Sequence, residues 1–176
     1  MEKRAIISVK STSNLDPNDA IEVVTPGKFI IEDNSFKAIY EESKISGMEG
    51  TTTTLNIMEN SMILQRAGST TTNMEFTEGE LAISLYNTPY GVLNLNVVTK
   101  QLKINIDENG GKIYTKYILG LEGQEGITTE LNIDIKVSKF KRTIVKITKV
   151  LFIVCPAWAT TWRWKSVVGL VVGTTS

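Results

Sequence analysis

Histidine is absent from this chain of 176 residues, and its single cysteine is Cys155. Ser-His-Asp and Cys-His nucleophilic systems, histidine-bound zinc or haem, cysteine-rich metal sites and disulfide frameworks all need residues that the chain lacks. Only carboxylates, tyrosines, lysines and arginines remain to transfer protons. We therefore expect no catalytic residue, no cofactor and no metal site, and we lean against an enzyme.

Helical, phosphate-binding and secretory patterns are also missing. No segment before residue 138 has a sustained 3.6-residue apolar repeat with helix caps. Gly110 and Gly111 lie between two expected strands, so they lack the helix N-terminus of a phosphate-binding loop. The N-terminus enters a strand pattern at once, without the long apolar stretch and cleavage site of a signal peptide. A cytoplasmic location is the expected default.

Charge is balanced in total but not along the chain. The 19 lysines and arginines equal the 19 acidic residues, which gives no reason to expect nucleic acid as a partner. The segment up to Asp134 holds every acidic residue and carries a net charge of −8, whereas the remainder carries +8. The C-terminal part therefore differs in character from the rest.

What the chain does contain is a series of short segments in which apolar residues alternate with polar ones. Alternation with a period of two is typical of strands with one buried face. The segments are residues 5–10, 21–31, 36–42, 51–58, 62–67, 70–77, 81–85, 93–98, 102–106, 113–121 and 127–137. Pro26-Gly27 predicts a bulge or bend inside the second segment. Residues 107–111, Asp-Glu-Asn-Gly-Gly, are the strongest hairpin signal.

The centre of the pattern is a corner at Tyr86-Asn87-Thr88-Pro89-Tyr90-Gly91. Pro89 cannot donate to a strand ladder, and Gly91 tolerates a φ that other residues avoid. On either side, Leu81, Ile83 and Leu85, and then Leu93, Leu95 and Val97, share one parity. We expect these two apolar sets to be the half-buried faces of the flanking strands.

About ten short strands with hairpin-length connections predict an all-β protein, an antiparallel meander that closes to remove its edges. A closed barrel is preferred over a two-sheet sandwich because the chain has none of the long crossings of sandwiches. We expect residues 1–137 to form the barrel domain. Residues 138–176 would be a basic, apolar extension, poorly ordered and foreign to the barrel.

Several short motifs occur in an order that resembles the YwiB-like family over roughly residues 3–137. They are Tyr40-Glu41-Glu42, Thr51-Thr52-Thr53, Arg66-Ala67-Gly68, Met74-Glu75-Phe76, Thr88-Pro89-Tyr90-Gly91, Gly111-Lys112-Ile113, Tyr117-Ile118-Leu119 and Leu131-Asn132-Ile133. The resemblance implies a small bacterial protein of uncharacterised function with a calycin-type, lipocalin-like β-barrel. It brings no catalytic residues.

Tyr40, Glu42, Thr53 and Arg66 form the most suggestive polar group, because three successive strands of a meander can bring them to one face. A buried carboxylate needs a partner, and Arg66 is the obvious one for Glu42. The pair is either an anchor for an anion or carboxylate at the barrel mouth or an internal pair that closes one barrel end, and we prefer the second. Glu41 and Glu42 point to opposite faces and cannot act together.

Tyr86, Tyr90 and Tyr117 are the aromatic candidates. Their hydroxyls could orient a ligand in a pocket. Packing at barrel corners, with the hydroxyl bonded to backbone, is the interpretation that we prefer.

The C-terminal extension holds all three tryptophans, Trp158, Trp162 and Trp164, and the cysteine. Residues 150–162 are uncharged but broken by Pro156, and a membrane-spanning helix needs about 20 apolar residues, so we expect no spanning segment. Lysines beside an aromatic apolar segment leave docking at a membrane surface open as a weaker alternative.

The sequence supports two functional hypotheses from different classes. The first is a binding module for a small molecule inside the barrel. The alternative is a protein-interaction module with a filled barrel and an acidic outer surface. The sequence assigns neither a ligand nor an oligomeric state.

Overall fold

The computed structural model describes residues 1–15, 20–88, 91–121 and 126–138. The chain divides into two units, Met1–Phe140 and Lys141–Ser176, of which the second lies outside the described residues. The expectations for the C-terminal extension and for Tyr90 therefore fall outside the described residues. Among those residues, no helix is long and apolar enough to cross a membrane.

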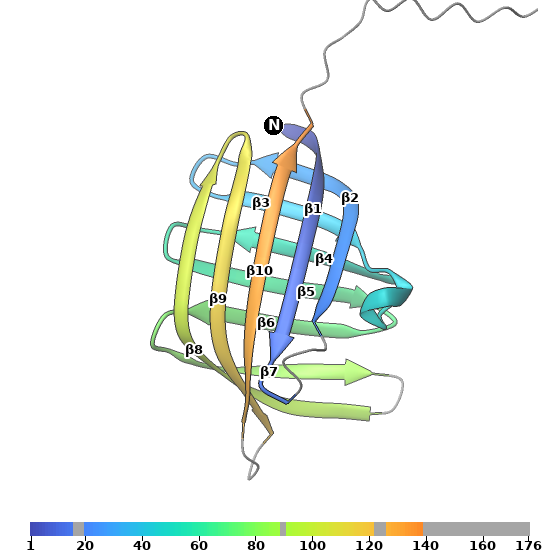
Figure 1. The fold of residues 1–176 in the computed structure, drawn as a ribbon, viewed down its shortest axis with the longest axis vertical. Helices are drawn as coiled ribbons and strands as arrows, with labels where there is room; N and C mark the ends of the chain where they lie inside the picture. The colour runs from blue at the N-terminus through green and yellow to red at the C-terminus, as the bar shows by residue number, and fades with distance from the viewer. Residues whose placement is uncertain (16–19, 89–90, 122–125, 139–176) are drawn as a thin grey trace, which may run out of the picture. The chain divides into compact units, whose positions relative to one another are not determined.

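The described residues of the first unit form ten strands and one short 3₁₀ helix (Figure 1). They are β1 (Glu2–Ser13), β2 (Ile21–Ile31), β3 (Phe36–Glu41), η1 (Lys44–Ser46), β4 (Thr51–Ile57), β5 (Ser61–Gly68), β6 (Thr71–Thr77), β7 (Leu81–Thr88), β8 (Gly91–Asp107), β9 (Gly110–Leu121) and β10 (Ile127–Val137). Each strand pairs antiparallel with the next, and β1 pairs with β10. The predicted all-β meander and its closure into a barrel are confirmed.

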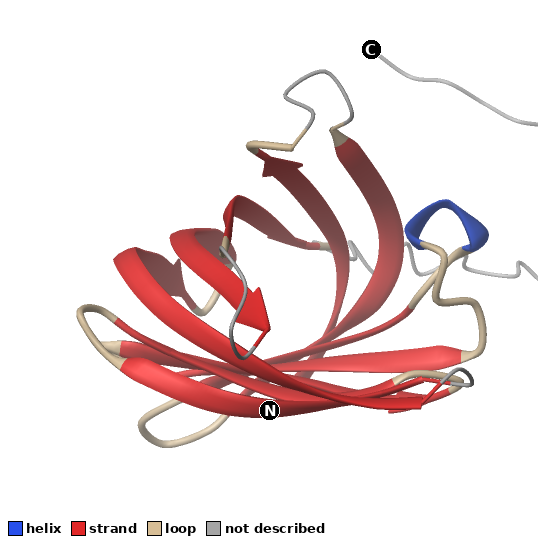
Figure 2. Ribbon diagram, turned by 90° about the horizontal axis from the view of Figure 1, so that it is seen from below, coloured by secondary structure: helices blue, strands red, loops and turns tan. Residues whose placement is uncertain are grey.

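The barrel wall has two sides that cross at a steep angle. In Figure 1, β1, β2, β9, β10 and the later part of β8 run close to vertical in front, and β3 to β7 cross behind them. Figure 2 shows the strands curving around the interior, with η1 at the rim. Side chains of alternate residues on both sides therefore point into one shared interior.

Strand β8 corrects one expected boundary. Residues 93–98 and 102–106 are one strand, whose register shifts between Thr99 and Gln101. This bulge leaves Lys100 exposed and changes the inward parity from odd to even. Val97 and Leu102 can both face the interior for this reason. At Pro26-Gly27, by contrast, the β1–β2 ladder continues without the predicted bulge.

Strand β7 corrects the expected orientation of its apolar residues. Leu81, Ile83 and Leu85 are exposed on the outer face, and Ala82 and Ser84 take the inward positions. Ser84 is buried and exchanges a hydrogen bond of 2.9 Å with Thr72 Oγ1. Alternation of apolar and polar residues predicts a strand, as found for β7, but it does not say which face of the strand is buried. Across the corner, Leu95 and Val97 are buried as expected, whereas Leu93 of the same set is 44% exposed.

One end of the barrel interior, which we call the packed end, is built mainly from apolar side chains, and a hollow of about 330 Å³ opens beside Phe36 and Ile57. Phe29, Phe36, Ile57, Met62 and Phe76 belong to the packed end. The rings of Phe29 and Phe36 stack with centroids 5.5 Å apart. Phe76 meets Tyr117 edge-to-face at 5.0 Å, and this contact joins the packed end to the polar part of the interior.

Candidate ligand site in the barrel interior

A row of inward-facing residues crosses the five strands β3 to β7, farther along the barrel interior than the packed end. Tyr40 of β3 pairs with Thr53 of β4, and Thr53 pairs with Arg66 of β5. The row continues through Thr72 to Tyr86. Because directly opposite residues share a face, the meander places these side chains on the interior side. Arg66 therefore points inward, although apolar residues on both faces of β5 leave its orientation open from the sequence alone.

Glu42 lies one residue beyond β3, where its backbone N–H donates to the Thr51 carbonyl at 2.8 Å. Its side chain is only 4% exposed. Oε1 accepts a hydrogen bond of 2.6 Å from Thr53 Oγ1. The same oxygen lies 3.5 Å from Arg66 Nε, on a side chain that is 18% exposed. The expected pairing of Glu42 with Arg66 is present.

The contact between these two charges is an ion pair by distance but not a hydrogen bond. Arg66 Nε is buried and has no hydrogen-bond partner among the described residues. Close Arg–carboxylate pairs usually hold two parallel hydrogen bonds, each under about 3 Å. The Glu42–Arg66 pair therefore leaves part of its bonding capacity unused.

The neighbouring Glu41 shows the opposite environment. It is exposed, and its Oε1 accepts a hydrogen bond of 2.8 Å from Thr52 Oγ1 on the outer face. The prediction that the two adjacent carboxylates point to opposite faces is confirmed. Glu41 is therefore a natural control for any experiment on Glu42.

Beside the ion pair lies a cavity of about 140 Å³. Its lining residues are Val9, Ser11, Ile21, Val23, Tyr40, Glu42, Ser46, Met48, Leu64, Arg66, Met74, Tyr117 and Leu131. Four of the seven residues proposed from the sequence, Tyr40, Glu42, Arg66 and Tyr117, thus meet at one cavity. Thr53 does not line the cavity but donates a hydrogen bond to Glu42. Tyr86 belongs to the inward-facing row and is not among the lining residues.

Burial keeps both cavity tyrosines protonated. The pKa of Tyr40 is raised, first by burial and then by the negative charge of Glu42, and Arg66 opposes this only in part. Burial likewise raises the pKa of Tyr117, against a smaller opposing effect of Arg66. At neutral pH the two side chains are therefore neutral hydroxyls, suited to donate hydrogen bonds.

Most residues of the cavity lining were not among the candidates proposed from the sequence. Met48 and Ser46 come from the connection between β3 and β4, and Val9, Ser11 and Val23 come from β1 and β2. The available signal was inward parity, which places Ser11 opposite the buried Leu131 of β10. Parity marks a residue as internal without saying whether it packs or lines a cavity.

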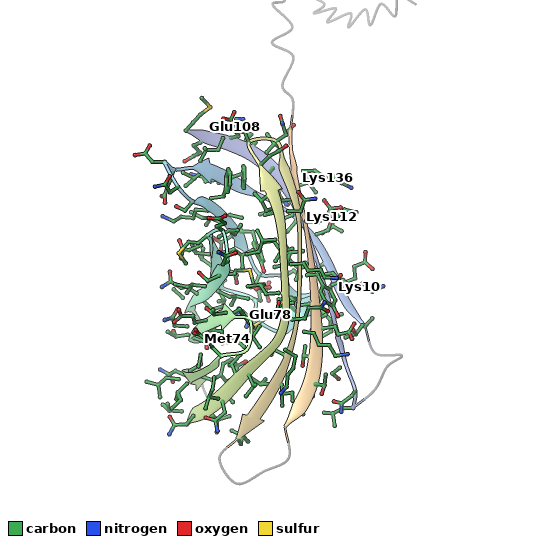
Figure 3. The ribbon with its side chains drawn as sticks, turned by 90° about the vertical axis from the view of Figure 1, so that its left-hand side faces the viewer. Lys10, Met74, Glu78, Glu108, Lys112 and Lys136 are labelled. Carbon is green, nitrogen blue, oxygen red and sulfur yellow. The ribbon has the colours of Figure 1, made fainter. Side chains whose placement is uncertain are left out.

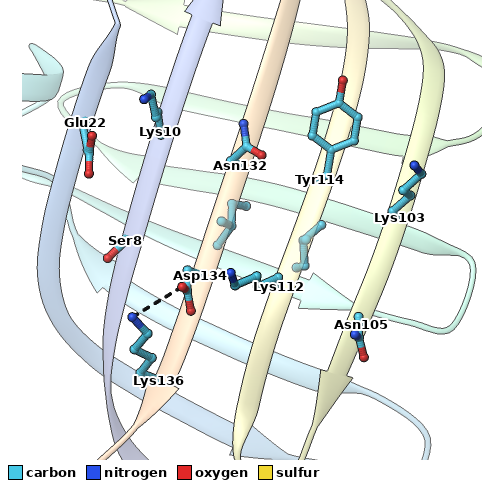
Figure 4. A pocket seen from close by; sticks show the side chains of 12 residues that line it. Ser8, Lys10, Glu22, Lys103, Asn105, Lys112, Tyr114, Asn132, Asp134 and Lys136 are labelled. Carbon is cyan, nitrogen blue, oxygen red and sulfur yellow. Dashed lines mark ion pairs between the residues drawn. The ribbon is translucent and has the colours of Figure 1, made fainter.

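The outer face of the front strands carries a separate, shallow hollow of about 500 Å³. Lys10, Lys103, Lys112 and Lys136 line it together with Tyr114 (Figure 4). Figure 3 shows Lys10, Lys112 and Lys136 extending from the same side of the barrel.

This outer hollow is open to water and only partly basic. Glu22 and Asp134 share its lining, and Lys136 lies 3.5 Å from Asp134. Water and salt screen such exposed charges strongly. The interior cavity, where both charges are shielded, is therefore the better candidate site. Among the described residues, no group of histidine, cysteine, aspartate or glutamate is placed to hold a metal ion.

Comparison with known proteins places this barrel in a family. Residues 7–133 match the family described as "Domain of unknown function (DUF1934)". The chain belongs to this family. The match covers the barrel from β1 to β10, so the candidate cavity lies wholly within the DUF1934 domain.

This chain is similar to a protein described as "Uncharacterized beta-barrel protein YwiB" from Bacillus subtilis (strain 168). It is 28% identical over 113 residues, which are 63% of this chain and 78% of the relative. The crystal structure of ywiB protein from Bacillus subtilis superposes with a TM-score of 0.69 at 24% identity, covering 78% of this chain and 93% of that chain. The likeness supports the β-barrel fold.

Proposed function

We propose that this protein binds a small molecule in the cavity beside Glu42 and Arg66. The observation that carries the proposal is a buried ion pair with unused bonding capacity, set in a largely apolar wall. Ligand sites commonly combine apolar walls with a few polar groups that fix orientation. A charge pair that served only to close the barrel end would be expected to satisfy its own donors.

The size of the cavity limits the ligand. A cavity of about 150 Å³ in another protein holds one benzene molecule, with about six non-hydrogen atoms. At about 140 Å³, this cavity suits a ligand of similar size. Lipids and nucleotides are too large to be enclosed there.

The two alternatives have less support. A filled barrel does not agree with the cavity at the Glu42 end. An enzymatic role gains something from the meeting of Glu42, Arg66 and two tyrosines, but the chain has no histidine, and its one cysteine, Cys155, lies outside the barrel strands. Binding needs no further group and is the function that we favour.

Native mass spectrometry of protein purified from cells, without added ligand, tests the proposal. We expect a retained small molecule on the wild type and its loss in a Ser11→Leu variant, which fills the cavity from β1. Ser8→Leu is the matched control, because Ser8 lies on the same strand opposite Asp134 and lines the outer hollow. The control should keep the molecule.

Two results would overturn the proposal. One is a wild-type protein with no bound molecule that also shows no response to small probes at the cavity. The other is a molecule retained equally by the wild type and by a folded Ser11→Leu variant, since it would then sit elsewhere.

A further inference from the structure

We propose that the ligand is a small zwitterion, with an ammonium and a carboxylate group on the same carbon atom, such as an α-amino acid with a short side chain. This inference rests on the proposed function and names the class of molecule that the cavity takes. It follows from the charges, the size and the wall of the cavity.

The charges carry the first step. Glu42 and Arg66 line the same cavity with their charged atoms 3.5 Å apart, and both side chains are shielded from water. A simple anion attracted to Arg66 would be repelled by Glu42, and a simple cation would meet the reverse problem. Because both side chains are largely buried, either repulsion would be stronger than between exposed charges. A ligand that carries both charges meets a favourable partner for each.

The spacing of the two charges is the second step. In an α-amino acid a single carbon atom separates the ammonium nitrogen from the carboxylate carbon. Its two charged groups can therefore lie alongside two protein charges that are themselves close together. The carboxylate would accept from the guanidinium of Arg66, and the ammonium would donate to the carboxylate of Glu42.

The rest of the lining fits the same class. The neutral hydroxyl of Tyr117 adds a donor for a carboxylate, whereas that of Tyr40 is hydrogen-bonded to Glu42 and Thr53. Leu64, Met74 and Leu131 add apolar lining for a short side chain. Alanine has as many non-hydrogen atoms as benzene, so it matches the volume argument, whereas amino acids with large side chains do not.

Four small probes of similar size separate the possible classes: alanine, propionate, isopropylamine and propionamide. Methionine methyl signals in NMR spectra of the full-length protein report where each probe binds. Met48 and Met74 line the cavity, whereas Met58 and Met62 do not. We expect alanine to shift the Met48 and Met74 signals at concentrations about tenfold lower than the other three probes.

A charge-neutral variant sharpens the test. Glu42→Gln removes the partner of the ammonium group, so it should abolish the preference for alanine over propionate. Glu41→Gln is the matched control, because the neighbouring carboxylate lies on the outer face, and it should leave the preference unchanged. The dispersion of the remaining methyl signals shows that each variant is folded.

The outcomes distinguish the inference from the proposed function. If propionate, isopropylamine or propionamide binds at the Met48 and Met74 side as well as alanine does, the zwitterion is wrong and the binding function stands. The same holds if all four probes fail while protein from cells retains a molecule that Ser11→Leu loses. If no probe binds and no molecule is retained, both fall together.

Discussion

Both ends of the barrel interior are lined by inward-facing residues of the same strands, but the types of residue differ between the ends. On β3, β4 and β5, the packed end places Phe36, Ile57 and Met62 side by side. Four residues further along, about 13 Å at the rise of a strand, the same strands place Tyr40, Thr53 and Arg66 side by side. We call this second region, with its cavity, the cavity end.

This difference separates stability from binding. Close packing of apolar side chains at one end supplies free energy of folding through burial and dispersion. At the cavity end, two buried charges and an unfilled volume both count against stability. The barrel can contain such a region because the packed end stabilises the fold as a whole. The contact between Phe76 and Tyr117 links the packed end to the cavity end.

The largest expected effect comes from emptying the packed end. Ile57 is 1% exposed and Ile83 is 74% exposed, so the same substitution to alanine compares the inside and outside of the wall. Ile57→Ala should lower the free energy of unfolding by about 2–5 kcal/mol. Ile83→Ala should change it by less than about 0.5 kcal/mol. Urea denaturation measures both, and equal losses would mean that Ile83 is covered in solution.

A smaller loss is expected at the cavity end from Arg66→Met. The substitution leaves the Glu42 carboxylate buried without its counter-ion, and because Arg66 is 18% exposed we expect a loss of about 2 kcal/mol, below that of a fully buried pair. The double variant Glu42→Gln/Arg66→Met should recover about half of this loss. Urea denaturation of the three proteins checks the order. No recovery in the double variant would show that Arg66 stabilises the barrel through its packing instead of its charge.

The sequence was informative about the two ends to different degrees. Alternation in β3 and β4 predicted one shared face for Tyr40, Glu42 and Thr53, whereas apolar residues on both faces of β5 left the orientation of Arg66 open. The pairing of Glu42 with Arg66 followed because a buried carboxylate requires a partner. The closed barrel followed from short connections between many strands. These predictions depend on local rules that the described structure obeys.

Other features depend on long-range geometry and could not be predicted. The outward position of Leu81, Ile83 and Leu85 depends on the register between β7 and β8, which their alternation leaves open. The single strand β8 depends on a bulge at Thr99 and Gln101 that resembles a strand break in the sequence. Met48 and Val23 line the cavity because their segments meet across the barrel, and the sequence does not show which segments meet.

Alkaline pH should affect the cavity end selectively. Because burial raises the pKa of Tyr40 and Tyr117 in the folded state, the unfolded chain loses these protons first, near its ordinary pKa of about 10. The stabilisation is complete below about pH 10 and is lost as the pH rises toward the folded pKa. Between these two pKa values, each of the two tyrosines should make the free energy of unfolding fall by about 1.4 kcal/mol per pH unit.

Tyr40→Phe isolates one of these contributions. The variant should lose stability less steeply than the wild type above about pH 10, and the two proteins should have parallel stability profiles below about pH 9. Urea denaturation across this range measures both slopes. Identical slopes above pH 10 would mean that the Tyr40 hydroxyl is open to solvent, and the shielded character of the cavity end would then be wrong.

The smallest effect is expected from removing residues 139–176. The ladder that closes the barrel, from Ala5–Val137 to Ser13–Thr129, is complete without them, and the Ser138 N–H donates to the Arg4 carbonyl at 2.8 Å. The residues named for the packed end and for the cavity lining all lie before this point. The chain ending at Ser138 should therefore melt within about 2 °C of the full chain, a shift that corresponds to less than about 0.5 kcal/mol.

A second, shorter chain shows that this measurement is sensitive. Ending the chain at Asn132 removes the buried Ile133 and Ile135 and opens the β1–β10 ladder, so this protein should be unfolded in circular dichroism. If the chain ending at Ser138 is also unfolded or aggregated, the last 38 residues contribute to the fold directly. The division between a stabilising packed end and a binding cavity end would then have to include them.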